Sequence, residues 1–198
     1  MSEARIEKPR SDVARNRLSI LTAARAMSAA SEPLQLNAVA HRAGLGVGTV
    51  YRHFPSPEAL SETLAADTFS KLLESAASAL AQADAAAAIR TLLDRTLSAY
   101  LSDEFFAAVI GSQTNLQSTR ELKVRFLGSL ETLFDRARAA NQLRIELTAA
   151  DAFNLLCGVG YAVRNAPSSP MVAADLATKS RYLQTLLDGM FGASDPGD

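Results

Sequence analysis

Apolar residues recur along the chain with the three- and four-residue spacing of amphipathic helices, and the alternation typical of β-strands is almost absent. Within residues 57–81, for example, Leu60, Leu64, Leu72 and Ala76 are expected to be buried. The pattern therefore predicts an all-α protein of about nine helices, the first three of which form a helix-turn-helix head. The expected helices are residues 13–30, 36–43, 47–53, 57–81, 85–101, a short one from about 103, 118–140, 148–165 and 172–191.

Helix start signals define several of these boundaries. Ser56 followed by Pro57 supplies a favourable N-cap and a favourable first helical residue. Ser118–Glu121 matches a capping box, and Thr148–Asp151 is expected to open the next helix. Residues 1–12, in contrast, are polar, contain a proline and are expected to form a mobile basic arm.

Three glycines in five positions mark the segment GLGVGTVYRHF, residues 44–54. A dinucleotide-binding loop needs the spacing G-x-G-x-x-G after a strand, whereas here the spacing is G-x-G-x-G after a predicted helix. A turn between two short helices fits better, with Gly44 as the left-handed residue that ends one helix and Gly46 as the N-cap of the next. Because small Ala40 precedes the turn and apolar Val50 follows it, the segment predicts a helix-turn-helix.

The sequence LNAVAHRAGLGVGTVYRHFPSPEAL resembles the DNA-binding signature of the TetR (tetracycline-repressor-like) family of bacterial regulators. The resemblance covers about residues 15–60 and joins ILTAA of the first helix to VAHRAG, GTVYRHF and EAL of the next three. It implies an N-terminal arm and helix-turn-helix DNA-binding domain at residues 1–56 and a helical effector-binding and dimerisation domain at residues 57–198. The position that the family usually caps with Ser or Thr, before the second helix, is Gln35 here.

The resemblance also implies which residues meet DNA. The helix at residues 47–53 would enter the major groove of a double-stranded operator with its N-terminal residues against base edges. Arg52 suits a bidentate contact with guanine, while Val50 and Phe54 would pack inward. The residues expected to contact DNA are Arg15, Arg17, Asn37, Val47, Gly48, Thr49, Tyr51, Arg52 and His53.

Charge is distributed unevenly between the two predicted domains. Of 20 basic and 21 acidic residues, residues 1–53 hold eight and four, a net charge of +4, which leaves 12 and 17, or −5, for the rest. A basic head on an acidic body is expected when only the head meets a polyanion. In the arm, Arg5, Lys8 and Arg10 either reach the minor groove or remain solvated.

For the body, the resemblance implies a small-molecule effector and a homodimer, with ligand binding releasing a palindromic operator. No cluster of charges indicates a ligand class, so an apolar or weakly polar effector is the default expectation. Candidate effector-binding residues are Phe69, Tyr100, Phe105, Phe106, Gln113, Asn115, Phe126, Phe134 and Tyr161. Two apolar stripes give Phe153, Leu156, Cys157, Gly160, Leu176, Leu183, Leu187 and Met190 as candidates for the dimer interface, the alternative being that both stripes face the core of their own chain.

Other classes of function find less support. The sequence has no nucleophile elbow, phosphate loop or metal-ligand spacing, so neither an enzyme nor a bound metal or cofactor is expected. The single cysteine excludes an internal disulfide, and no apolar run approaches the roughly 18 residues of a membrane span, so a cytoplasmic protein without membrane attachment is expected. A regulator whose body binds a protein partner, and an activator, remain open alternatives to the ligand-released repressor.

Overall fold

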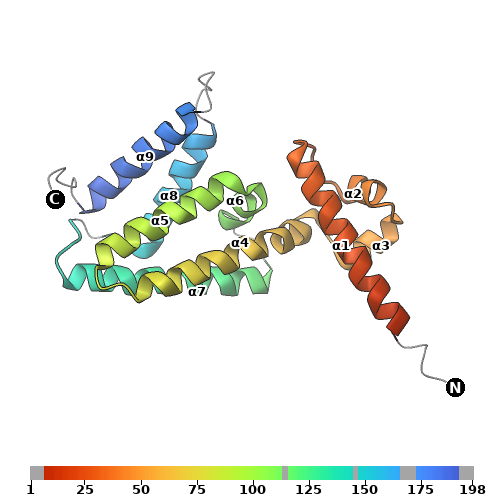
Figure 1. Ribbon diagram of the computed structural model, residues 1–198, viewed down its shortest axis with the longest axis horizontal. Helices are drawn as coiled ribbons and strands as arrows, with labels where there is room; N and C mark the ends of the chain where they lie inside the picture. Colours follow the sequence, from red (N-terminus) through yellow and green to blue (C-terminus); the bar gives the residue numbers. More distant parts are fainter. Residues whose placement is uncertain (1–6, 113–115, 145–146, 166–172, 192–198) are drawn as a thin grey trace. The chain divides into compact units, whose positions relative to one another are not determined.

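The computed structural model describes residues 7–112, 116–144, 147–165 and 173–191 (Figure 1). Within these ranges the chain forms nine α-helices and no β-strand, which confirms the all-α prediction. The helices are α1 (Glu7–Ala29), α2 (Leu36–Ala43), α3 (Val47–His53), α4 (Pro57–Leu80), α5 (Ala85–Ser102), α6 (Glu104–Ile110), α7 (Gln117–Ala139), α8 (Ala149–Arg164) and α9 (Ala173–Phe191).

The chain divides into two compact units, Met1–Ala65 and Ala66–Asp198, and the division falls within α4. The first unit holds α1, α2, α3 and the beginning of α4, and the second holds the rest of α4 together with α5 to α9. The predicted DNA-binding domain ends where α4 begins, so the compact unit adds the first turns of α4 to it.

The core of the first unit joins its three N-terminal helices. Ile20 and Ala24 of α1, Val39 and Ala40 of α2, and Val50 of α3 have no exposed surface. α2 contacts both α1 and α3, and Ala40 leaves room for that approach because its side chain is a single methyl group. Packing in this core therefore fixes the orientation of α3.

α5 is the central helix of the second unit, since it contacts α6, α7, α8 and α9. Its residues Ile89, Leu93 and Leu97 are fully buried, as are Leu130 and Phe134 of α7. α8 and α9 lie side by side and both contact α5, so each of these helices has one covered and one uncovered side (Figure 1).

Within the second unit, a polar contact fastens the start of α6 to α4. Asp103 is the N-cap of α6, and its Oδ1 accepts hydrogen bonds from the N–H groups of Phe105 and Phe106, each at 3.0 Å. Its Oδ2 accepts a hydrogen bond from the Thr68 hydroxyl of α4 at 2.5 Å. The neighbouring Phe69 packs edge-on against Phe106, with ring centroids 4.9 Å apart. One carboxylate thus caps a helix and ties it to its neighbour.

Two of the predicted helix starts are confirmed in detail. The N–H of Ala59 donates to Ser56 Oγ at 3.3 Å at the start of α4. At the start of α8, the N–H of Asp151 donates to Thr148 Oγ1, and the N–H of Thr148 donates to Asp151 Oδ2, each at 3.1 Å. The hydrogen bonds to Asp151 hold the pKa of its carboxyl below the usual value.

The predicted arm is shorter than expected, because α1 begins at Glu7 rather than at residue 13. Pro9 lies in the first turn, where its missing N–H forfeits no helical hydrogen bond. Lys8 and Arg10 therefore belong to α1, and Arg5 lies outside the described residues.

The capping box predicted at Ser118–Glu121 is also wrong. α7 begins earlier, at Gln117, and Leu116 precedes it without a side-chain cap. Glu121 instead accepts a hydrogen bond from the side chain of Gln117 at 2.9 Å, one turn away on the same helix. This contact engages the carboxylate that a capping box would have used.

Most residues of the apolar stripes predicted for a dimer interface are buried within the second unit, as expected for the alternative in which the stripes face the core of their own chain. The buried residues of these stripes are Phe153, Leu156 and Gly160 of α8, and Leu183, Leu187 and Met190 of α9. A Cβ at Gly160 would lie 2.6 Å from Cδ1 of Tyr100, so this glycine packs against α5 rather than against a partner chain. Cys157 is half-buried, and the side chain of Leu176 lies outside the described residues. Periodic spacing identifies a buried side but does not reveal what covers it.

Candidate nucleic-acid interface

The turn between α2 and α3 depends on one glycine in a left-handed conformation. Gly44 has φ 66°, and its N–H donates to the His41 carbonyl at 3.2 Å while that of Leu45 donates to the Ala40 carbonyl at 3.0 Å. These bonds close the end of α2, and a residue with a Cβ would be strained at this position. Gly46 then caps α3 with extended backbone, so both predicted glycine roles agree with the geometry.

α3 buries one side and exposes the other. Val50 is fully buried and Phe54, directly after the helix, is 2% exposed. Val47 and Tyr51 are 45% and 48% exposed, and Arg52 is exposed as well. The exposed side of α3 therefore carries an apolar, an aromatic and a cationic side chain on a helix that its buried side holds in place.

The other residues of α2 and α3 that were predicted to contact DNA differ in exposure. Gly48 and Asn37 are exposed, whereas Thr49 and His53 are half-buried. The N-cap of α2, Gln35, makes no side-chain hydrogen bond to the helix. The first turn of α2 thus has no side-chain cap, which suits a helix start that meets an anion such as phosphate.

The two arginines predicted to hold phosphates are in different surroundings. The Arg17 guanidinium lies 4.9 Å from the centroid of the Phe54 ring, so α1 also contacts the end of α3 through this cation–π pair. Arg15 pairs with Asp12 at 3.1 Å, with both side chains more than half exposed. An exposed pair of this kind contributes at most about 1 kcal/mol, so Arg15 can exchange Asp12 for a phosphate at little cost.

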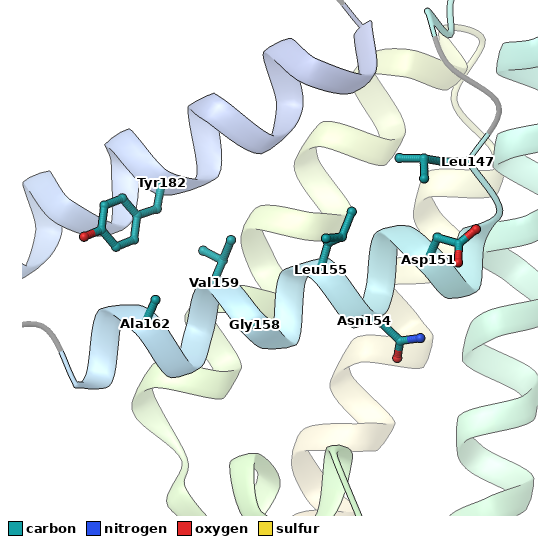
Figure 2. Close-up of a pocket in the computed structure, with 8 residues that line it drawn as sticks. All are labelled: Leu147, Asp151, Asn154, Leu155, Gly158, Val159, Ala162 and Tyr182. Atoms are coloured by element: carbon teal, nitrogen blue, oxygen red, sulfur yellow. The ribbon is translucent and has the colours of Figure 1, made fainter.

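A first hollow on the second unit, of about 680 Å³, opens between α8 and α9. Figure 2 shows Leu155, Val159 and Ala162 along α8, with Tyr182 on α9. Leu147, Asp151, Asn154 and Gly158 complete the lining. Leu155 and Tyr182 are 47% and 38% exposed. This hollow is mostly apolar and lies on the opposite side of α8 from the buried stripe.

A second hollow, of about 470 Å³, lies where the end of α6 meets α7 and α8. Its lining comprises Ile110, Gly111, Ser112, Arg120, Lys123, Val124, Leu127, Ala150, Phe153, Asn154 and Cys157. Arg120 and Lys123 were not among the residues predicted from the sequence to bind an effector. Their three-residue spacing predicts that both lie on one side of the same helix. It does not predict a hollow, because α6 and α8 form the other walls.

The residues predicted to bind an effector lie elsewhere in the second unit. Phe69, Phe106, Phe126 and Phe134 are core residues, Tyr100 and Phe105 are half-buried, Tyr161 is exposed, and Gln113 and Asn115 lie outside the described residues. None of the described members of this set lines either hollow.

Two further observations concern the described residues alone. They contain no group of three or more His, Cys, Asp or Glu side chains placed to hold a metal ion. None of their helices combines the length and the apolar character needed to cross a bilayer.

Comparison with known proteins places these features in context. The model of the family described as bacterial regulatory proteins, tetR family, matches residues 20–64, which include the whole of α2, the turn and α3. Among solved structures, the chain is similar to the TetR transcriptional regulator SCO0520 from Streptomyces coelicolor, with 30% sequence identity, a TM-score of 0.53 and coverage of 90% of this chain and 99% of that one.

Two more distant structures share the fold. One is the transcriptional regulator FadR from Bacillus subtilis in complex with stearoyl-CoA, at 20% identity and a TM-score of 0.59, with 87% of this chain and 98% of that one covered. The other is RolR in complex with the ligand resorcinol, at 17% identity and a TM-score of 0.59, with 93% and 91% covered. A comparison with curated proteins gave no match.

Proposed function

Because the chain belongs to the TetR family of bacterial regulatory proteins, we propose that it is a sequence-specific transcriptional regulator that acts in the cytoplasm as a homodimer. It would repress by occupying a palindromic operator and leave that operator when a small molecule binds to its second unit. The observation that carries the DNA-binding part is the exposed side of α3, where Tyr51 and Arg52 are exposed while Val50 of the same helix is fully buried.

In this proposal α3 enters the major groove and α2 lies across the backbone. Arg52 donates to guanine or to phosphate, and Tyr51 and Thr49 contact phosphates or thymine methyl groups. Asn37 and the uncapped start of α2 add backbone contacts, as does Arg15 after leaving Asp12. These contacts divide into base readout by α3 and positioning by α1 and α2.

The test begins with an operator selected from a pool of genomic DNA by the purified protein. Arg52→Ala should weaken binding to that operator roughly 5- to 150-fold, the effect of about 1–3 kcal/mol for a bidentate base contact. Arg125→Ala is the matched control, since Arg125 is an exposed arginine of α7 in the second unit. Fluorescence anisotropy measures the affinity, and far-UV circular dichroism checks the fold of each variant. If both variants bind as tightly as the parent protein, α3 is not the reading helix.

A small-molecule effector is supported by the hollow where the end of α6 meets α7 and α8, and by relatives of the same fold. FadR was solved with stearoyl-CoA and RolR with resorcinol, each bound to that protein. The hollow of about 470 Å³ in this chain falls within the range of ordinary ligand pockets, roughly 300–1,000 Å³. A ligand that binds better to a conformation unable to span the operator would release it by population shift.

The dimer is supported by the uncovered sides of α8 and α9 rather than by their buried stripes. On α8, Gly158 and Ala162 are small, exposed and one turn apart, which permits close approach of another helix. Leu155, Val159 and Tyr182 offer apolar area beside them (Figure 2). A second copy of the chain, related by a two-fold axis, would cover the same surface on both protomers. Two heads so related bind half-sites one helical turn, or a multiple of it, apart.

A further inference from the structure

The hollow at the junction of α6, α7 and α8 combines charge and apolar surface, and the predicted default of an apolar or weakly polar effector does not account for that. Arg120 and Lys123 line it from α7, one turn apart. The Lys123 ammonium donates to the Ser112 carbonyl, just past the end of α6, at 2.9 Å. This bond places the Lys123 ammonium beside the end of α6, at the edge of the hollow.

The described lining includes two cations and no carboxylate. Asn154 and Ser112 are its uncharged polar members. A concave surface that carries two positive charges attracts anions. Arginine and lysine are also the side chains that make charge-assisted hydrogen bonds to carboxylate and phosphate groups.

The rest of the lining is suited to hydrocarbon. Ile110, Leu127 and Phe153 contribute apolar walls from three different helices. The Phe153 ring packs against the Phe126 ring, with centroids 5.9 Å apart. Val124, 69% exposed, lies on the same helix as the two cations. The hollow therefore has apolar walls on three helices and its cations on one.

Cys157 gives this hollow a built-in reporter. It is the only cysteine of the chain, and it lines the hollow from α8. Burial raises the pKa of its thiol, and the positive charge of Lys123 acts in the opposite direction. Cys157 and Lys123 line the same hollow, so a ligand bound there would lie close to the thiol.

We infer that this hollow binds an organic anion, a carboxylate with a hydrocarbon or aromatic body, with Arg120 and Lys123 on the carboxylate and Phe153, Leu127 and Ile110 on the body. The inference deepens the proposed effector role and rests on it for its regulatory meaning. The volume of the hollow, about 470 Å³, accommodates a ligand with a medium-sized hydrocarbon or aromatic body together with its carboxylate.

The experiment uses full-length protein, with decanoate as the probe and decan-1-ol as its uncharged counterpart. Each is titrated against the rate at which N-ethylmaleimide alkylates Cys157, followed by mass spectrometry near pH 8. Decanoate should slow alkylation at concentrations at which decan-1-ol has little effect. Lys123→Met should raise the decanoate concentration for half-protection roughly tenfold, because a charge-assisted hydrogen bond is lost.

Arg125→Met is the matched control, since Arg125 is an exposed arginine of the same helix that does not line the hollow. It should leave protection by decanoate unchanged. Arg120→Met provides a second test should Lys123→Met disturb the fold, which circular dichroism would show. Equal protection by decanoate and decan-1-ol would overturn the inference, as would an equal loss of protection in Arg120→Met and Arg125→Met.

Operator binding measured in parallel separates this inference from the proposed function. If decanoate protects Cys157 as described and also lowers operator affinity, both stand. If it protects Cys157 but leaves operator affinity unchanged, the anion site stands and its role as an effector site fails. If the chain binds no operator, the DNA-binding proposal fails whatever happens at Cys157.

Discussion

Removal of the Asp103 side chain should destabilise the second unit. Its Oδ1 caps α6 through two backbone N–H groups at 3.0 Å, and its Oδ2 accepts from Thr68 of α4 at 2.5 Å. Loss of a helix N-cap costs about 1 kcal/mol. Loss of a part-buried hydrogen bond to a charged group costs roughly 1.5 kcal/mol, the lower end of its range. Asp103→Ala should therefore lower the free energy of unfolding by about 2–3 kcal/mol.

Urea denaturation followed by far-UV circular dichroism, at one fixed protein concentration, measures this loss. With a urea dependence of about 2 kcal/mol per molar, the midpoint should fall by a little over 1 M. Asp103→Asn should cost much less, because asparagine caps helices well and can still bond Thr68. Asp84→Ala is the matched control: on an exposed surface, Asp84 Oδ1 caps α5 through the N–H of Ala87 and also accepts from the side chain of Gln142, each at 3.1 Å, so about 1 kcal/mol is expected because exposed hydrogen bonds add little. A loss in Asp103→Ala no larger than in Asp84→Ala, or an equal loss in Asp103→Asn, would refute this reasoning.

Three further predictions concern the turn, a helix cap and the dimer. Gly44→Ala should lower the free energy of unfolding by about 1–2 kcal/mol because φ is 66°, whereas Gly128→Ala, with open space around its Cβ, should leave it unchanged or raise it; urea midpoints measure both. The pKa of Asp151 lies below its ordinary 3.8 because Thr148 donates to it, so the stabilisation this gives α8 is present above about pH 3.8 and is lost as pH falls through the native pKa. Thr148→Ala should raise that pKa in an NMR titration, and an unchanged value would contradict the cap. Leu155→Glu should convert a dimer to monomers at micromolar concentration by light scattering, and a persisting dimer would place the interface away from α8.

The features that could be predicted from sequence are those set within a few residues. Gly44 ends α2 in the left-handed conformation, and Ser56 and Thr148 cap the helices that follow them, because each of these features depends on bonds between residues at most five positions apart. The exposed side of α3 was likewise predictable, since Val50 and Phe54 share one helical side and Tyr51 and Arg52 the other. Local prediction failed at the start of α1, which begins at Glu7 rather than at residue 13, and at the start of α7, where Glu121 pairs with Gln117 instead of forming a capping box.

Tertiary packing alone decides what covers the apolar side of a helix. It also decides which residues that are distant in sequence come together. The stripe of Phe153, Leu156 and Gly160 reads the same from sequence whether it faces α5 or a second chain, and only the tertiary structure turns it inward. In the sequence, Arg120 and Lys123 are only two cations on one helix. In the tertiary structure they line a hollow together with the end of α6 and the side of α8 that carries Cys157. Helical hydrogen bonds and caps are short-range in the chain, so the sequence determines them directly. A hollow is the space that several packed elements leave between them, so it exists only once those elements are in place.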